Sequence, residues 1–255
     1  MDEVKKQNEN MLERVRPEQV GVLSQGILDF LKTVKEKNIN MHCFMLLRHG
    51  KVAAEGYFRP FDGKHVHNIY SVSKSVTSAA IGIAAGDGLL TLEDRVIDYF
   101  PEKLAPNVHE YTAMMKIKHL LSMSTVHHKS TDTKGDDWVG SFLNTPPSHM
   151  PGTIFAYDTT GVHTLCAIIQ KVTGKTVLEY LSEKLFEPIG MGKIEWESCP
   201  MGINKGGSGI KCTIEDMARF GQLYLQDGVW NGKRILPDGW VSLSTSRHID
   251  NTNTK

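Results

Sequence analysis

The stretch Ser71-Val72-Ser73-Lys74 opens a run of mostly small and apolar residues that extends to Gly86. A serine and a lysine three positions apart on a helix share one face, so the amine of Lys74 can reach the hydroxyl of Ser71. An alcohol needs such a neighbour, because its own pKa is far too high for attack on a carbonyl at neutral pH. The first turn of a helix also offers N–H groups and a partial positive charge to a developing oxyanion. The stretch therefore predicts a nucleophile, a base and an oxyanion donor within one turn.

The surroundings of this stretch carry more weight than the tetrapeptide, which arises by chance about once in a chain of this length. Val76 and Ile83 follow a helical period among Ala, Gly and Ser, which is typical of a helix enclosed by neighbours. Lys74 is the only charged residue between Ser71 and Gly86. A buried ammonium needs a partner or a lowered pKa. The alternative is that Lys74 extends to solvent and Ser71 only caps the helix.

Composition excludes several classes of function. Lysine plus arginine and aspartate plus glutamate number 29 each, so no surplus of positive charge favours nucleic acid or an anionic membrane as a partner. No apolar run is long enough to span a membrane. The first ten residues are polar and contain no hydrophobic core of a secretory signal, which predicts a cytoplasmic protein.

Neither cofactor nor metal is expected. Pairs of histidines occur at positions 65 and 67 and at 127 and 128, but neither pair has the spacing of a helical zinc site with a nearby carboxylate. The cysteines form no C-x-x-C pair, and we expect free thiols in a reducing compartment. They are Cys43, Cys166, Cys199 and Cys212.

Local patterns predict strands near both ends of the chain and helices between them. Residues 16–37 have the spacing of an opening helix, and the runs 42–48 and 51–58 flank a His-Gly turn that is typical of a hairpin. Thr91 with Asp94, and Thr213 with Asp216, have the pattern of capping boxes that begin helices. Further elements are expected as helices at 119 onward, 160–173, 177–186 and 214–226, a strand at 210–213 and a hairpin at 229–235. This order favours an α+β fold.

Several segments, in the order of a known family, carry a resemblance that covers most of the chain from about residue 40 onward. They are Tyr70–Thr77, Gly86–Asp94, Ile117–Met123, Pro151–Tyr157, Leu185–Met191, Gly206–Gly209 and Asp216–Gly221. Together they resemble the serine β-lactamase and penicillin-binding-protein superfamily. The resemblance is strongest to its class C-like branch, which also contains esterases and 6-aminohexanoate-dimer hydrolases.

The resemblance implies a β-lactamase/transpeptidase-like α+β fold, with an antiparallel sheet flanked by helices and a helical insert. Residues 1–70 with 190–255 would form the α/β part and residues 71–189 the mainly helical part, with the active site in the cleft between them. Relatives carry further C-terminal strands and a closing helix that we expect to be missing here. An open strand edge would then pair with that segment or with another chain.

The resemblance also implies the catalytic set Ser71, Lys74 and Tyr157. The family places an asparagine two residues after its tyrosine, where this chain has Thr159. A hydroxyl lacks the amide that holds both a lysine and a substrate carbonyl. Efficient β-lactam hydrolysis is therefore less expected than ester or amide hydrolysis. The alternative for Tyr157 is a packed tyrosine bonded to backbone.

Other residues are candidates for substrate binding. Trp138 follows two aspartates in a polar stretch that could lie over the cleft, although a partly buried aromatic is the ordinary alternative. Asn204 and Gly207 belong to a glycine-rich loop whose backbone can approach a ligand closely, with simple loop flexibility as the alternative. The family's late Lys-x-Gly or His-x-Gly strand is not found in its place, and the letters Lys-Gly-Gly at 205–207 are interpreted as a coincidence.

These observations lead to one main hypothesis and two alternatives. The main hypothesis is a serine hydrolase that acts on a small-molecule ester or amide through an acyl-enzyme. One alternative is a β-lactamase or a penicillin-binding D-alanyl carboxypeptidase. The other is a catalytically incomplete fragment or binding module, because loss of an oxyanion donor costs roughly a hundredfold to a thousandfold in rate.

Overall fold

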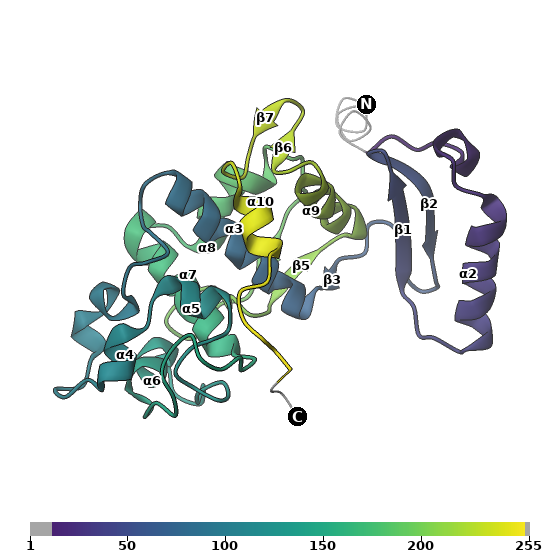
Figure 1. Cartoon of the computed structure of the whole chain (residues 1–255). Coiled ribbons are helices and arrows are strands. Elements are labelled where there is room, and N and C mark those ends of the chain that lie inside the picture. Colours follow the sequence, from purple (N-terminus) through teal and green to yellow (C-terminus); the bar gives the residue numbers. More distant parts are fainter. Residues whose placement is uncertain (1–11, 253–255) are drawn as a thin grey trace.

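The computed structural model describes residues 12–252, which form a small N-terminal lobe and a larger, mostly helical body. The lobe lies to the right in Figure 1, and the helices from α3 to α8 lie to the left. The lobe consists of the 3₁₀ turn η1 (Pro17–Val20), helix α2 (Ser24–Glu36), and strands β1 (Cys43–Arg48) and β2 (Lys51–Tyr57).

The body contains the remaining elements, most of them helical. In chain order they are β3 (His67–Asn68), η2 (Tyr70–Val72), α3 (Ser73–Gly86), η3 (Val96–Tyr99), η4 (Pro101–Lys103), α4 (Glu110–Met114), α5 (Ile117–Leu121), α6 (Trp138–Asn144), α7 (Thr159–Thr173), α8 (Val177–Leu181), the π-turn η5 (Ser182–Phe186), β4 (Glu195–Trp196), β5 (Ile210–Cys212), α9 (Ile214–Leu225), β6 (Val229–Trp230), β7 (Lys233–Arg234) and α10 (Trp240–Thr245). The mixture of helices and small antiparallel sheets confirms the α+β class. The division at residues 70 and 190 stays a prediction.

Helix α3 is the centre of the body, as its composition predicts. It is buried on nearly all sides and packs against α7 and α8. Its small residues allow other segments to approach closely. A Cβ on Gly82 would lie 2.4 Å from the ring of Trp240 in α10, and a Cβ on Gly86 would lie 2.6 Å from Pro237. Glycine is therefore required here for packing rather than for an unusual backbone angle.

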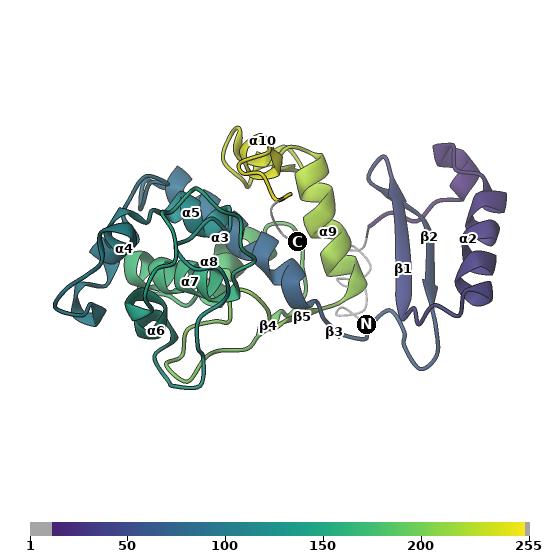
Figure 2. The ribbon, with the colours of Figure 1, turned by 60° about the horizontal axis from the view of Figure 1, so that its bottom comes forward.

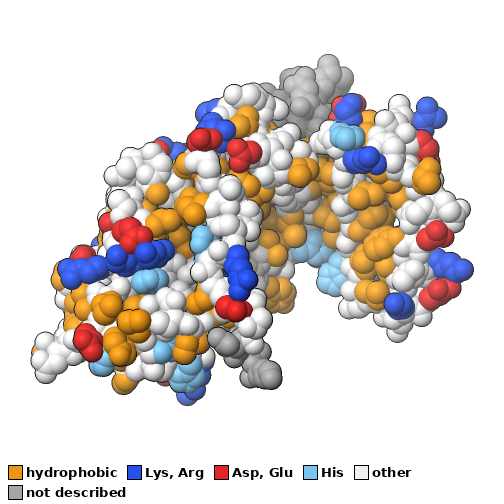
Figure 3. Space-filling model, viewed as in Figure 1, with side chains coloured by type: hydrophobic (Ala, Val, Ile, Leu, Met, Phe, Trp, Pro, Cys, Tyr) orange, Lys and Arg blue, Asp and Glu red, His pale blue; other side chains and the backbone are white. Residues whose placement is uncertain are grey.

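The hairpin of β1 and β2 is confirmed, but the single sheet built from both ends of the chain is not. The turn has both His49 and Gly50 at positive φ, the conformation that tight hairpins need. Within residues 12–252, β1 pairs as a strand only with β2, whereas β3, β5 and β4 form a separate small antiparallel sheet. Hydrophobic side chains gather on the lobe, and the surface is hollowed between lobe and body (Figure 3). Strand pairing along β1 stays a prediction.

Two predicted helices were wrong in extent or kind. The opening helix is broken, because Gly21 adopts φ 70° and ends η1 before α2 begins at Ser24. Thr91 donates its backbone N–H and its hydroxyl to the Asp94 carboxylate, but no α-helix follows them. The next backbone N–H groups bond across the chain instead, as Val96 donates to the carbonyl of Met115. A tertiary partner thus replaces the helical one, and only the 3₁₀ turn η3 forms.

The second capping box was predicted correctly and begins α9. Thr213 accepts from the backbone of Asp216, whose carboxylate accepts from the backbone of Thr213 in return. Helix α9 then runs between the hairpin and the body, in contact with β1 (Figure 2). The helices predicted at 160–173 and 177–186 are also present, the latter as α8 continued by η5.

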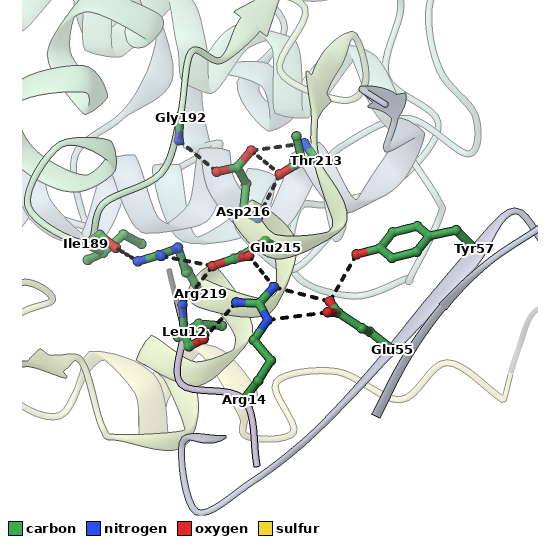
Figure 4. A network of polar contacts seen from close by, with 10 residues as sticks. All are labelled: Leu12, Arg14, Glu55, Tyr57, Ile189, Gly192, Thr213, Glu215, Asp216 and Arg219. Atoms are coloured by element: carbon green, nitrogen blue, oxygen red, sulfur yellow. Dashed lines mark hydrogen bonds and ion pairs between the residues drawn. The ribbon is translucent and has the colours of Figure 1, made fainter. Parts of the chain in front are cut away.

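An ionic network joins the lobe to α9 (Figure 4). Arg14 contacts Glu55 of β2 at 3.2 Å and Glu215 of α9 at 2.7 Å. Glu215 also accepts from the backbone of Leu12 and from Arg219, which in turn donates to the carbonyl of Ile189. Burial raises the pKa of the Glu215 carboxyl, but the hydrogen bonds from Arg14, Leu12 and Arg219 outweigh it, and the pKa is lowered.

The close contact at Gly82 predicts opposite effects of two glycine substitutions. Gly82→Ala should lower the free energy of unfolding by about 1–3 kcal/mol, because the methyl group displaces the buried ring of Trp240. Gly26→Ala in α2 has open space around it and should raise that free energy by up to about 1 kcal/mol through helix propensity. Denaturant titration of both variants measures the effects, and a neutral Gly82→Ala would contradict the packing argument.

The lowered pKa of Glu215 predicts a pH-dependent contribution to stability. The group is depressed on folding, so its contribution is full above its unfolded pKa of about 4.3 and is lost as the pH falls through its folded value. Glu215→Gln should therefore cost about 1–3 kcal/mol near pH 7, and the difference from the unsubstituted protein should shrink below about pH 4. Glu93→Gln is the control, because solvent screens its ion pairs with Lys116 and Lys118. A stability difference that does not change with pH would exclude this linkage.

Candidate active site

Ser71 lies on the turn that precedes α3 rather than in the helix itself. Residues Tyr70–Val72 form the 3₁₀ turn η2, and the α-helix begins at Ser73. Tyr70 has φ 45°, in the left-handed region that is uncommon for a non-glycine residue, and its N–H donates to Asn68. Ser71 is exposed as a result, whereas Ser73, the first residue of α3, is fully buried. Strain beside an exposed side chain is typical of functional positions.

Two side chains, one from α3 and one from the segment before α7, meet at the hydroxyl of Ser71. The ammonium of Lys74 donates to the Ser71 Oγ at 3.2 Å, and the Tyr157 hydroxyl donates to the same oxygen at 2.8 Å. The Lys74 Nζ also lies 4.8 Å from the centre of the Tyr157 ring. The residues that the sequence singled out are thus brought together, 86 positions apart in the case of Ser71 and Tyr157.

The phenol of Tyr157 is held where both partners affect its ionisation. Burial raises the pKa of the phenol, but the hydrogen bonds of Ser71 and Lys74 and the charge of Lys74 outweigh it, so the pKa is lowered. The ring is still 53% exposed, and solvent can reach it. The neighbouring backbone is fixed, because Ala156 donates to the carbonyl of Met123 and Asp158 caps α7.

Asp158 has a structural role that the sequence analysis missed. Its buried carboxylate accepts from the backbone N–H groups of Thr160 and Gly161 and from the hydroxyl of Thr125. An aspartate that precedes a helical pattern is a strong capping signal, and that signal could have identified it. The cap fixes the first turn of α7, which carries Thr159 beside the site.

The Lys74 ammonium also forms a hydrogen bond with the backbone of Gly207. Its carbonyl accepts from the Lys74 Nζ at 2.7 Å, and the preceding carbonyl, of Gly206, accepts from Thr77 at 2.9 Å. A Cβ on Gly207 would lie 2.4 Å from Thr159 and 3.1 Å from the Lys74 Nζ. Only glycine allows this approach, so the 205–209 loop belongs to the site even though it is no strand.

The remaining predicted binding residues divide into two groups. Trp138, Thr159 and Gly207 line one cavity beside the lysine. Asn204 does not, because its amide accepts from Leu178 and donates to Trp196 and Ser198 within the core. A packing role explains Asn204, and it is removed from the candidate binding residues.

His163 lines the same cavity and was not singled out by the sequence analysis. It lies four positions after Thr159 on α7, so both side chains share one face of that helix. That spacing could have identified it once Thr159 was assigned to the site. Within residues 12–252 no cluster of three metal-ligating side chains occurs, and no helix there has the length and apolar character needed to cross a bilayer.

The comparisons with known proteins place the chain in a family. Residues 34–254 match the beta-lactamase family model, so the chain belongs to the beta-lactamase family. It is 28% identical over 219 residues to the 6-aminohexanoate-dimer hydrolase of Paenarthrobacter ureafaciens. The aligned region covers 78% of this chain and 55% of that protein. It is 24% identical over 211 residues to a beta-lactamase of Escherichia coli, with 74% and 55% covered.

A solved structure supports the same fold. The octameric penicillin-binding protein homologue of Pyrococcus abyssi superposes with a TM-score of 0.71 at 18% identity, over 91% of this chain and 62% of that one. The chain therefore has the β-lactamase-like fold, as the sequence predicted. It spans about half the length of the curated relatives that it matches.

The geometry at Tyr157 predicts its effect on rate. If the phenolate is the base, activity should rise with pH through a pKa that lies below the ordinary value near 10. Tyr157→Phe should lower kcat by about a hundredfold or more, change KM less, and remove that rising limb of the pH profile. An unchanged kcat would show that Lys74 alone is the base.

Proposed function

We propose that this protein is a serine hydrolase that cleaves an ester or amide through an acyl-enzyme. The observation that carries the proposal is the meeting of Lys74 and Tyr157 at the hydroxyl oxygen of Ser71. In this arrangement Ser71 can be the nucleophile, and Lys74 and Tyr157 can accept, hold and return its proton. Membership of the beta-lactamase family supports the same assignment.

The proposed reaction proceeds in two halves, the acylation of Ser71 and the hydrolysis of the acyl-enzyme. The phenolate of Tyr157, stabilised by the Lys74 ammonium, takes the proton of Ser71 as the serine oxygen bonds to the carbonyl carbon. The backbone N–H of Ser71 donates to the resulting oxyanion. The bond to the leaving group then breaks, and Tyr157 returns its proton to the departing alcohol or amine. In the second half Tyr157 takes a proton from water as the water oxygen attacks the acyl carbon. The bond to the serine oxygen then breaks, Tyr157 returns the proton to that oxygen, and the acid is released.

The carbonyl of Gly207 gives the lysine a role in this scheme. That carbonyl accepts from the Lys74 Nζ at 2.7 Å, and the same Nζ lies 4.8 Å from the centre of the Tyr157 ring, where its charge stabilises the phenolate. The lysine then acts as an electrostatic partner, and Tyr157 carries the proton.

A β-lactamase or D-alanyl carboxypeptidase is the second candidate, favoured by the name of the Escherichia coli relative. Thr159 weakens it, because a hydroxyl donates and accepts through a single oxygen, whereas an amide has an NH₂ group that donates and a separate oxygen that accepts. The relative from Paenarthrobacter ureafaciens is named as a hydrolase of a 6-aminohexanoate dimer, which supports a non-lactam substrate. An incomplete module, the cytoplasmic location and strand pairing along β1 stay predictions.

A fluorophosphonate probe tests the nucleophile directly. It should label the intact protein on Ser71, and Ser71→Ala should abolish both labelling and turnover while the thermal unfolding midpoint stays the same. Ser75→Ala is the matched control, because Ser75 is an exposed serine in the first turn of α3, and this variant should label normally on Ser71. An adduct mapped to Ser73, Ser75 or Ser208 would refute the assignment.

The substrate class needs a separate panel. Turnover of p-nitrophenyl butyrate and a linear amide, with little turnover of a cephalosporin or a D-Ala-D-Ala peptide, would support the main proposal. The reverse order would favour the second candidate, and labelling without turnover of any substrate would favour the incomplete module.

A further inference from the structure

A cavity of about 230 Å³ lies between the start of α6, the first two turns of α7 and the 205–208 loop. Its lining consists of Trp138, His163 and Lys205 together with three threonines, Ser208 and Gly207. Two of these residues, Thr159 and Gly207, also surround the Lys74 ammonium. The cavity therefore adjoins the proposed active site through these two residues.

His163 is the unusual group in this lining. Its side chain is 2% exposed, yet neither ring nitrogen has a hydrogen-bond partner of normal geometry in the described part of the chain. Burial lowers the pKa of the imidazole to about 4, although the nearby backbone of Asn204 counters part of that effect. At neutral pH the ring is uncharged and offers one N–H donor and one acceptor. A buried polar group without a partner is costly, and a bound ligand can supply that partner.

Trp138 and Lys205 form the walls beside this histidine. The indole ring lies 4.9 Å from the imidazole ring, and its N–H is already used by the carbonyl of Gly135. The face of the indole is thus an apolar surface without a free donor. The Lys205 Nζ lies 6.0 Å from the centre of the same ring and pairs at 3.2 Å with Glu197, whose side chain is largely exposed. Solvent screens that pair, and a ligand oxygen can compete for the ammonium.

The lining contains hydrogen-bond donors and a cation but no carboxylate. An acyl chain that ends in a carboxamide or carboxylate oxygen finds donors from Lys205 and Ser208, and from the imidazole when its N–H faces the cavity. A chain that ends in an ammonium faces the Lys205 cation, and no carboxylate of the lining offsets that repulsion. The chemistry of the cavity therefore discriminates by the far end of the chain.

We propose that this cavity binds the acyl group of the substrate and selects acyl chains that end in an oxygen acceptor over chains that end in an ammonium. The proposal rests on the proposed hydrolase function and names the substrate class for that site. Tyr157 returns its proton to the leaving group and is half exposed, so the leaving group departs toward solvent. The half-enclosed cavity that adjoins Lys74 through Gly207 is left for the acyl group, which stays on Ser71 until water releases it.

The volume sets the length of the chain. At about 30 Å³ for each water-sized group, 230 Å³ holds roughly eight such groups. An acyl chain of six or seven non-hydrogen atoms beyond the carbonyl fills that space. The half-ester or monoamide of a six-carbon dicarboxylic acid has this size.

Four p-nitrophenyl esters test the selectivity on the full chain. The adipamoyl and 6-methylheptanoyl esters are isosteric and differ only in a terminal carboxamide or isopropyl group. The adipoyl ester ends in a carboxylate, and the 6-aminohexanoyl ester ends in an ammonium. We expect kcat/KM to be at least about tenfold higher for the carboxamide and carboxylate chains than for the isopropyl chain, and lowest for the ammonium chain. Equal values for all four, or a preference for the ammonium, would overturn the proposal.

Substitutions assign the effect to this cavity. Lys205→Met keeps the apolar stem and removes the charge, so it should reduce the preference for carboxylate over isopropyl by about tenfold. His163→Phe should reduce the preference for carboxamide in the same way, and the lysine variant stands in if that protein does not fold. Lys193→Met, at an exposed lysine outside the cavity, is the matched control. Preferences that survive both cavity variants would place the selectivity elsewhere.

A binding measurement separates this proposal from the hydrolase assignment. Ser71→Ala should bind methyl adipamate at least about tenfold more tightly than methyl 6-aminohexanoate, measured by titration calorimetry, because the two differ only at the far end and neither has a free carboxylate. Equal affinities would overturn the proposal even if Ser71 hydrolyses esters. Selective binding by a chain that shows no turnover would support the cavity and refute the proposed hydrolase.

Discussion

The hydrogen bond between the Lys74 ammonium and the carbonyl of Gly207 is the contact on which the site depends. It joins two segments 133 residues apart and holds the lysine within reach of both Ser71 and Tyr157. The contact is possible only because the loop carries no side chain at that position, where a Cβ would meet Thr159. The geometry of the site thus follows from a backbone contact, and a point charge that is fixed in this way can stabilise a phenolate next to it.

The packing of α3 holds the contact between Lys74 and Gly207 in place. Its small side chains let α7 and α10 approach the helix, and the glycines of the 206–207 loop let that loop approach α7. Thr77, one turn beyond Lys74, holds the preceding carbonyl of the loop, so two successive peptide groups are tied to one helix. A larger residue on α3 would act on the site indirectly, through the position of the loop.

The N-terminal lobe is joined to the body by a different kind of interaction. Arg14 lies between two carboxylates, and Glu215 at the start of α9 receives two guanidinium groups and a backbone N–H. This junction between lobe and body consists of partly solvated charges, whereas the body around α3 is held together by close apolar packing. The junction responds to pH as a consequence, because its central carboxylate changes its proton affinity on folding.

Local patterns determined much of this protein before its fold was known. The buried helix with Lys74, the His49-Gly50 turn and the Thr213 cap of α9 depend on neighbours within a few residues, and such short-range preferences are legible in sequence. The same preferences misled at Asp94, whose capping bonds form although Val96 donates to Met115 instead of starting a helix. The role of the Gly207 carbonyl, the core position of Asn204 and the unsatisfied ring of His163 were decided only by tertiary structure. Each depends on which distant segment comes within a few ångströms, and no local pattern encodes that distance.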